Sequence, residues 1–209
     1  MSLYQTYIKK AMDFALALIL IVMLSPLYLV LWLVIRLSMG APVIFTQNRV
    51  GKDEKIFRMY KFRSMTDKKD ANGELLPDVQ RITLIGKILR KSSLDEIPQF
   101  FNILKGDMSF IGPRPLMDYE LEYLTEEERK RHCVMQGITG LAQVSGRNML
   151  SNEEKFVKDL EYTKKISFAT DLKIALKTIP SLLFAKNITV INNTHLDLTR
   201  DSNEETTEK

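Results

Sequence analysis

The sequence predicts a protein of mixed helices and a small sheet, α/β in the broad sense and α+β in its layout, attached to a membrane near its N-terminus. Three observations predict this class. A run of 22 residues without charge, Phe14 to Ile35, is long enough to enter a membrane. Residues 42–47 and 55–65 are rich in β-branched and aromatic side chains and flank a connector that contains a glycine. Further along the chain, apolar residues recur at helical spacing.

The uncharged run contains Ser25-Pro26 near its middle. Proline removes a backbone donor and clashes with the preceding turn, so we expect the helix to break into two halves, each too short to cross a bilayer. Lys9 and Lys10 precede the run, and Arg36 follows it. Because lysine and arginine collect on the cytoplasmic side, positive charge at both ends favours a helix that enters the membrane and returns. The short N-terminal flank leaves a kinked transmembrane span as an alternative of equal weight.

Residues 42–47 and 55–65 predict an antiparallel hairpin, because the connecting stretch "NRVGKDE" is short and contains a glycine. The polar stretch 66–78 is expected to be a loop, with Asn72-Gly73 as its turn signal. The sequence therefore places one small sheet before the remaining helices.

Four later segments show helical periodicity. Residues 82–90 predict a short amphipathic helix, and 97–104 a second helix that ends at Gly106. Residues 152–165 predict a third. In 171–186 the apolar residues share one face and the lysines another, so this helix lies either in a membrane interface or against the core. Its apolar positions are Leu172, Leu176, Ile179 and Leu183.

The composition excludes several classes. The net charge of +4 and the pI near 9.0 are too mild to indicate nucleic acid. A single cysteine, Cys133, and two histidines argue against an internal disulfide and a structural zinc site. The chain has no G-x-x-x-x-G-K-[ST], G-x-G-x-x-G or H-E-x-x-H motif and no two aspartates spaced two apart. Nucleotide-binding loops, zinc proteases and D-x-D transferases are therefore disfavoured.

The adjacent acids Asp95 and Glu96 allow two interpretations. Ser93-x-x-Glu96 matches a capping box, in which the acids only complete a helix N-terminus. The alternative follows from the basic neighbours, which include Arg90 before the pair and Arg114 between two prolines after it. We expect such cations to lower the pKa of the carboxyls and keep them ionised. An ionised carboxylate there could attack phosphorus or hold Mg²⁺ against a diphosphate.

Two interpretations without catalysis also fit the residues. In one, the chain is a membrane scaffold whose basic hairpin binds anionic lipid headgroups. In the other, the basic stretch binds RNA through the interleaved aromatic residues Phe57, Tyr60 and Phe62. The membrane segment and the modest net charge count against the second, so we expect no nucleic-acid partner.

Four motifs in order carry a resemblance to a known family. They are "FTQNRVG" (45–51), "YKFRSM" (60–65), "SSLDEIPQFFNILKGDMSFIGPRP" (92–115) and "GITGLAQVSGR" (137–147). With these motifs the chain resembles the bacterial sugar transferase family of monotopic phosphoglycosyl transferases, in its small form, from about Tyr4 to about Leu183. The resemblance implies transfer of a phosphosugar from a UDP-sugar to polyprenol (undecaprenyl) phosphate, with release of UMP. It also suggests an N-acetylated amino sugar as the donor's sugar.

The resemblance implies roles for individual residues. Asp95 would be the nucleophile and form a covalent aspartyl phosphosugar, which gives ping-pong kinetics. Glu96 would position the cofactor Mg²⁺ together with Asp95. Arg114 would bind a phosphate, with Arg90 in support. Further substrate-binding residues in the matching motifs would be Lys61, Arg63, Gln143 and Arg147.

The family's re-entrant helix, broken at a Ser-Pro, matches Ser25-Pro26 and favours the hairpin over the kinked span. Residues 1–38 would then form the membrane helix, 39–190 the catalytic domain and 191–209 a polar, disordered tail. The resemblance places the protein at the cytoplasmic face of a bacterial inner membrane, with both termini in the cytoplasm.

Overall fold

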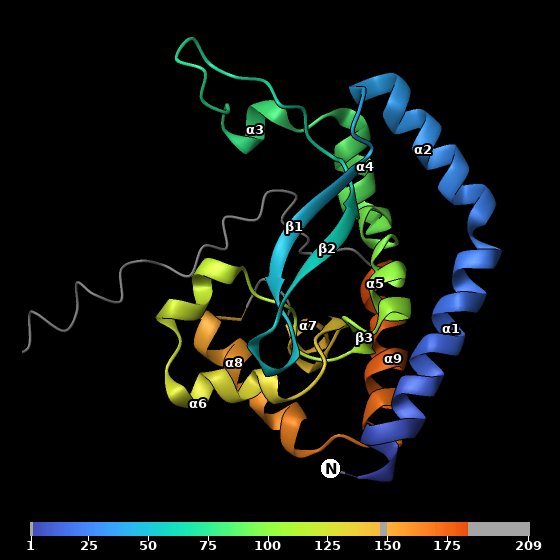
Figure 1. Cartoon of the computed structure of the whole chain (residues 1–209), viewed down its shortest axis with the longest axis vertical. Helices are drawn as coiled ribbons and strands as arrows, with labels where there is room; N and C mark the ends of the chain where they lie inside the picture. Colours follow the sequence, from blue (N-terminus) through green and yellow to red (C-terminus); the bar gives the residue numbers. More distant parts are fainter. Residues whose placement is uncertain (1, 147–149, 184–209) are drawn as a thin grey trace, which may run out of the picture.

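The computed structural model describes residues 2–146 and 150–183, and it combines many helices with little sheet (Figure 1). An antiparallel strand pair lies at the centre of the view, and helices surround it. The predicted fold class is confirmed. The predicted tail, 191–209, lies outside the described residues.

The uncharged run forms two helices that lie along one side of the molecule (Figure 1). A short π-helix, η1 (Tyr4–Ile8), leads into α1 (Lys9–Met23), and α2 (Ser25–Met39) follows at a bend of 63°. Within the described ranges, no single helix is long and apolar enough to cross a membrane, but the bent pair passes that test together. Much of its surface is apolar and exposed, including Met23 and Leu37.

The bend has a local cause. Leu24 leaves the helical conformation, with φ −91° and ψ 5°. The hydroxyl of Ser25 donates to the carbonyl of Val22 over 2.8 Å, and Pro26 lies in the first turn of α2, where a helix needs no N–H. The break predicted at Ser25-Pro26 is therefore confirmed.

The predicted hairpin is present as β1 (Ile44–Val50) and β2 (Ile56–Phe62). The strands are antiparallel, and the first residue of β1 pairs with the last residue of β2. A short 3₁₀ turn, η2 (Lys52–Glu54), joins them. β1 runs three residues beyond its predicted end because Val50 is fully buried and extends the strand into the core.

The helix predicted for 82–90 is present as α4 (Leu84–Ser92), shifted by two residues. Thr83 sets its start, because its hydroxyl oxygen accepts from the N–H of Gly86 over 2.9 Å. Before it, a one-turn helix that the sequence analysis did not predict, α3 (Asp78–Arg81), ends the polar loop.

The acid pair lies in a 3₁₀ turn, η3 (Leu94–Glu96), followed by α5 (Gln99–Lys105). Ser93 has φ 57°, the left-handed conformation that ends α4, and its side chain makes no capping hydrogen bond to η3. The capping-box interpretation of Ser93 and Glu96 is therefore wrong. The predicted end of α5 at Gly106 is confirmed, with φ 80° there.

A parallel pair of short strands, β3 (Ser109–Ile111) and β4 (Gly137–Thr139), was not predicted. A Cβ atom on Gly137 would lie 2.1 Å from the backbone nitrogen of Gly112, so glycine permits this close approach. The elements around this pair are η4 (Asp118–Tyr123), α6 (Glu126–Arg129), η5 (Lys130–Cys133) and α7 (Leu141–Ser145).

The two C-terminal helices confirm the predicted segments as α8 (Asn152–Lys164) and α9 (Phe168–Leu183). Ile174 of α9 is buried against the core, whereas Leu172 and Leu176 on the predicted apolar face are 47% and 60% exposed. α9 thus packs through one side and presents an apolar stripe outward, as an interfacial helix does.

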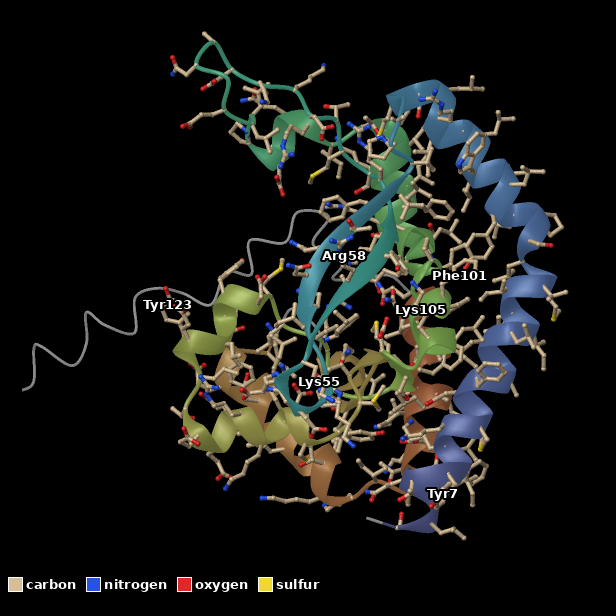
Figure 2. All side chains as sticks on the ribbon, viewed as in Figure 1. Tyr7, Lys55, Arg58, Phe101, Lys105 and Tyr123 are labelled. Atoms are coloured by element: carbon tan, nitrogen blue, oxygen red, sulfur yellow. The ribbon has the colours of Figure 1, made fainter. Side chains whose placement is uncertain are left out.

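The bent pair packs into the same core as the rest of the protein. Ile35 of α2 is fully buried and packs in one cluster with Phe62, and Ala17 of α1 is buried in another with Ile103. Figure 2 labels Phe101 on the side of α5 that faces this pair. The acid pair is therefore held at a set position relative to the apolar helices.

Candidate active site

A tight chain reversal between α4 and α5 positions Asp95 and Glu96. Ser93 turns the chain in its left-handed conformation, and Pro98 directly precedes α5. Asp95 is only 7% exposed, and a carboxyl group is seldom this deeply buried without a specific reason. The turn therefore holds two adjacent acids inside the protein.

Glu96 is held by two cations on one oxygen. Its Oε1 accepts from Lys61 Nζ over 2.8 Å and from Arg114 Nη2 over 2.7 Å. Burial alone would raise the pKa of Glu96, but the charges of Arg114 and Lys61 outweigh burial and hold it far below its usual range. Glu96 therefore stays ionised at neutral pH.

Asp95 behaves in the opposite way. Burial, followed by the negative charge of Glu96, raises the pKa of Asp95 to about 6, although Lys61, Arg90 and Arg114 oppose the rise. The expectation that nearby cations lower the pKa of both carboxyls is thus wrong for Asp95, because burial outweighs them. The pair is divided into one permanently charged group and one that titrates near neutral pH, a pattern typical of acid–base and nucleophilic sites.

The cations come from three separate elements. Lys61 is near the end of β2, Arg114 follows β3, and Arg90 lies in the last turn of α4. Arg90 is oriented by a 2.9 Å bond from its Nε to Ser64 Oγ. The side chain of Arg114 is 42% exposed, against 17% for Lys61, so Arg114 can also meet an anion from solution. The site therefore consists of two adjacent acids and three basic side chains from separate parts of the chain.

Two of the predicted substrate-binding residues, Arg63 and Gln143, make no hydrogen bond to Asp95 or Glu96 within the described residues. Arg63 is largely buried and uses its guanidinium on Ala41 O at 3.0 Å, Met65 O at 2.9 Å and Asp67 at 2.6 Å. This geometry favours a structural role for Arg63, joining the end of α2 to β2. The amide of Gln143 has both polar atoms buried without a hydrogen-bond partner in the described part of the chain.

Arg147, the last of the predicted substrate-binding residues, lies outside the described residues. Cys133 is exposed and His132 is buried.

One supporting residue was missed by the sequence analysis. Asn102 of α5 is fully buried; its Oδ1 accepts from the N–H of Tyr60 over 3.0 Å, and its Nδ2 donates to Arg58 O over 2.7 Å. These bonds fix β2 directly before Lys61, near the position labelled Arg58 in Figure 2. An asparagine inside the apolar run "FFNIL" was the signal that could have revealed it.

A family profile matches this chain over residues 4–185, and its description is "Bacterial sugar transferase". The chain belongs to this family.

Curated relatives agree with the assignment of this sugar transferase. It is 46% identical over 187 residues to the uncharacterized sugar transferase EpsL of Bacillus subtilis, covering 89% of this chain and 92% of that protein. It is 41% identical over 185 residues to an Aeromonas hydrophila protein named UDP-N-acetylgalactosamine-undecaprenyl-phosphate N-acetylgalactosaminephosphotransferase. It is 39% identical over 184 residues to the UDP-glucose:undecaprenyl-phosphate glucose-1-phosphate transferase of Escherichia coli.

The latter two alignments cover 85% and 82% of this sugar transferase but only 44% and 39% of those relatives. These relatives therefore carry additional sequence beyond the part that matches this chain.

The acid pair of this sugar transferase fits one particular kind of metal site. Among the described residues, no group of three or more His, Cys, Asp or Glu side chains could hold a metal ion. Mg²⁺ needs less from the protein, because it is usually bound by one or two carboxylates together with water and substrate phosphates. Asp95 and Glu96 supply that number, so the donor set fits Mg²⁺ bound along with a diphosphate.

Proposed function

We propose that this sugar transferase moves a sugar phosphate from a UDP-sugar to polyprenol phosphate, releasing UMP and forming a polyprenyl diphosphate sugar. The names of the Aeromonas and Escherichia relatives support this reaction, because each names a UDP-sugar and undecaprenyl phosphate. The observation that carries the proposal is the division of the acid pair into an ionised Glu96 and a buried Asp95 whose pKa is raised to about 6.

Asp95 is the nucleophile in this mechanism. A carboxylate oxygen of Asp95 attacks the phosphorus next to the sugar, the bond from that phosphorus to the bridging oxygen breaks, and UMP leaves. An oxygen of polyprenol phosphate then attacks the same phosphorus and releases the Asp95 carboxylate. The two displacements give ping-pong kinetics through an aspartyl phosphosugar.

The choice of Asp95 over Glu96 follows from their surroundings. Two cations bind one oxygen of Glu96 and depress its pKa, which makes it a weak base and a weak nucleophile. Asp95 has the higher pKa and is the more basic carboxylate, yet it is still mostly ionised at pH 7. Asp95 is therefore the better group to form a bond to phosphorus.

The remaining residues bind charge. Mg²⁺, when bound by Asp95 and Glu96, would neutralise oxygens of the diphosphate. Arg114, whose side chain is more exposed than that of Lys61, binds a substrate phosphate through its planar guanidinium. Lys61 holds Glu96 in place, and Arg90 supports the anion site from α4. Glu96 and Lys61 thus act mainly by keeping the site organised.

We further propose that the bent pair is a re-entrant anchor at the cytoplasmic face of a bacterial inner membrane, with both termini in the cytoplasm. Its two ends contact the same globular body. At the start, Lys9 Nζ binds Asp171 Oδ2 over 2.8 Å; at the end, the carbonyl of Met39 accepts from Arg63 over 3.3 Å. A transmembrane span would separate these contacts by the thickness of the bilayer, about 30 Å.

We propose an N-acetylated amino sugar as the transferred sugar, which the name of the Aeromonas relative supports. The Escherichia relative is named for glucose, so the assay includes both types of donor.

The test uses the full chain in membrane nanodiscs that contain undecaprenyl phosphate and Mg²⁺. UMP release is measured with UDP-N-acetylgalactosamine, UDP-N-acetylglucosamine, UDP-glucose and UDP-galactose. We expect release with wild type and none with Asp95→Asn, because an amide cannot attack phosphorus. Intact mass without lipid acceptor should show wild type heavier by one phosphosugar, and Asp95→Asn unchanged.

Each outcome separates a different claim. UMP release without an adduct would disprove the covalent step but keep the reaction. No release from folded protein with any donor would favour the scaffold interpretation, in which Asp95→Asn has no effect on function. Activity that survives a chelator would remove Mg²⁺ from the proposal.

A further inference from the structure

The segment that carries Arg114 is held through its carbonyl groups. The prolines at 113 and 115 have no N–H, so Arg114 supplies the only backbone donor of this tripeptide. At the two ends of the 113–116 segment, backbone N–H groups donate hydrogen bonds to its carbonyl groups. Gly137 N–H donates to Pro113 O over 2.8 Å, and Val50 N–H donates to Leu116 O over 2.9 Å. The segment is therefore tied to β4 on one side and to β1 on the other.

Between those ends, the hydrogen bonds to the carbonyl groups come from two arginine side chains. Arg131 Nη2 donates to the carbonyl of Arg114 over 2.8 Å, and Arg49 Nη1 donates to the carbonyl of Pro115 over 3.1 Å. Arg49 is itself held by Gln47 Oε1 at 2.9 Å. Four consecutive carbonyls, from 113 to 116, thus each accept a hydrogen bond from a separate residue.

Arg131 is one of the most deeply buried side chains of the protein. It is 2% exposed and forms an ion pair with Asp159 of α8, with Nη2 and Nε at 2.5 and 3.1 Å from Oδ2. Its guanidinium also lies 5.4 Å from the ring centre of Phe156. α8 therefore holds the guanidinium of Arg131, and the same nitrogen, Nη2, donates to both Asp159 and the carbonyl of Arg114.

The buried ion pair of Arg131 and Asp159 contributes little to stability. Arg131 Nη1 and Asp159 Oδ1 are both buried and, among the residues that the structure describes, have no hydrogen-bond partner. Burial raises the pKa of Asp159 even though Arg131 opposes the rise. A buried ion pair with unsatisfied atoms contributes little more than apolar side chains of similar size would. What the pair does provide is a rigid donor at the carbonyl of Arg114.

We propose that Arg131, anchored by Asp159, is a positioning residue for Arg114. It fixes the backbone from which the Arg114 side chain reaches Glu96 and a substrate phosphate. Small displacements of a group that binds a reacting phosphate lower its effectiveness strongly. This proposal rests on the phosphate-binding role of Arg114 given above.

The test is a double-mutant cycle on the affinity for UDP, a probe that does not depend on the identity of the sugar. The pair is replaced as Arg131→Met with Asp159→Leu, which leaves no unpaired buried charge. We expect Arg114→Ala to weaken UDP binding about tenfold, in line with the loss of a charge-assisted bond. The replaced pair should weaken it about fivefold, and the triple variant should be no more than about twofold weaker than Arg114→Ala.

The matched control is Arg129→Met. Arg129 lies two residues from Arg131, but it binds Glu54 at 3.0 Å and Leu121 O at 2.9 Å. UDP affinity should change less than about twofold, because no atom of the 113–116 segment depends on this side chain. Melting temperatures of all variants report on folding separately.

Three results decide the proposal. If the effects of the Arg131–Asp159 replacement and Arg114→Ala multiply, Arg131 does not act through Arg114 and the proposal is wrong. If Arg114→Ala leaves UDP affinity unchanged, the phosphate role of Arg114 fails and the inference falls with it. If the replaced pair does not fold, Arg131→Lys serves instead; it keeps the charge beside Asp159 but not the fork, and unchanged UDP affinity in it would contradict the proposal.

Discussion

The phenol hydroxyl of Tyr28, in the apolar helix α2, donates to the backbone carbonyl of Ile97, the residue directly after the acid pair. The ring is fixed by Phe62 and Phe101, whose centres lie 5.9 and 5.8 Å away. α2 therefore contacts the turn that carries Asp95 and Glu96 directly.

Tyr28→Phe removes only this hydroxyl. We expect UMP release to fall about fivefold, because the turn that carries the acid pair loses one restraint. The free energy of unfolding should fall by only about 1 kcal/mol, the usual contribution of one hydrogen bond. Both quantities are measured on protein in nanodiscs, by turnover and by thermal unfolding.

Tyr4→Phe is the control for this prediction. It also removes a hydroxyl from the N-terminal helical region, one that donates to Asp171 on α9 over 2.8 Å. Equal losses of activity in the two variants would show that the contact to Ile97 has no special role.

Features with local causes were predicted well. Ser25-Pro26 broke the apolar helix, and Gly106 ended α5, because each acts through its own backbone. The parallel strands β3 and β4 were missed because three residues per strand are too few to show a period. The capping box failed for a different reason: Ser93 ends one helix, and the cations compete for Glu96.

In the candidate site, too, the residues in local motifs were predicted and the residues with distant partners were not. Its acids and three of its cations were named from motifs, and the structure brings Lys61, Arg114 and Glu96 together. The residues that support them could not be found this way, because their partners are remote in sequence. Tyr28 and Ile97 are 69 residues apart, and no periodicity or spacing rule joins such positions.

The raised pKa of Asp95 predicts the acid side of the pH profile. Protonated Asp95 cannot attack phosphorus, so kcat/KM for UMP release should fall as the pH drops below about 6. Lys61→Met should move this limb to higher pH, because Lys61 lowers the pKa of Asp95. A profile that is flat from pH 5 to 8, or a limb that Lys61→Met moves downward, would contradict the assignment.

The two acids should affect stability with opposite signs. The folded pKa of Asp95, about 6, lies above its reference value of 3.8, so its contribution to stability is present at low pH and is lost as the pH rises through about 6. Asp95→Asn should therefore stabilise the protein at pH 8 by on the order of 3 kcal/mol, from about 1.4 kcal/mol per pKa unit. The gain should disappear near pH 4.

Glu96 provides the opposite case. Its folded pKa is depressed, so its contribution is present above the unfolded value and is lost as the pH falls. Glu96→Gln should destabilise the protein at pH 8, and thermal unfolding at two pH values measures both effects. If both variants changed the stability at pH 8 in the same direction, the pKa values of the two acids would not be shifted in opposite directions.

The helix break predicts the topology of the anchor. Replacing Ser25 and Pro26 with leucine should straighten the pair into one helix of about 45 Å, which exceeds the membrane core of about 30 Å. Straightening would also pull Lys9 from Asp171. With Cys133→Ser as background and Ser2→Cys as the probe, a membrane-impermeant maleimide should label intact cells only when the helix is straight.

The control is the protein that keeps Ser25 and Pro26 and carries only Cys133→Ser and Ser2→Cys. Its cysteine at position 2 should react with the maleimide only after the cells are opened. Labelling of that protein from outside would place its N-terminus across the membrane. The contacts of Lys9 and Met39 with one globular body could not then coexist, because Lys9 and Asp171 would lie on opposite sides of the bilayer. Protection in both variants would instead mean that the charges of Lys9 and Lys10, rather than the Ser25-Pro26 break, hold the N-terminus in the cytoplasm.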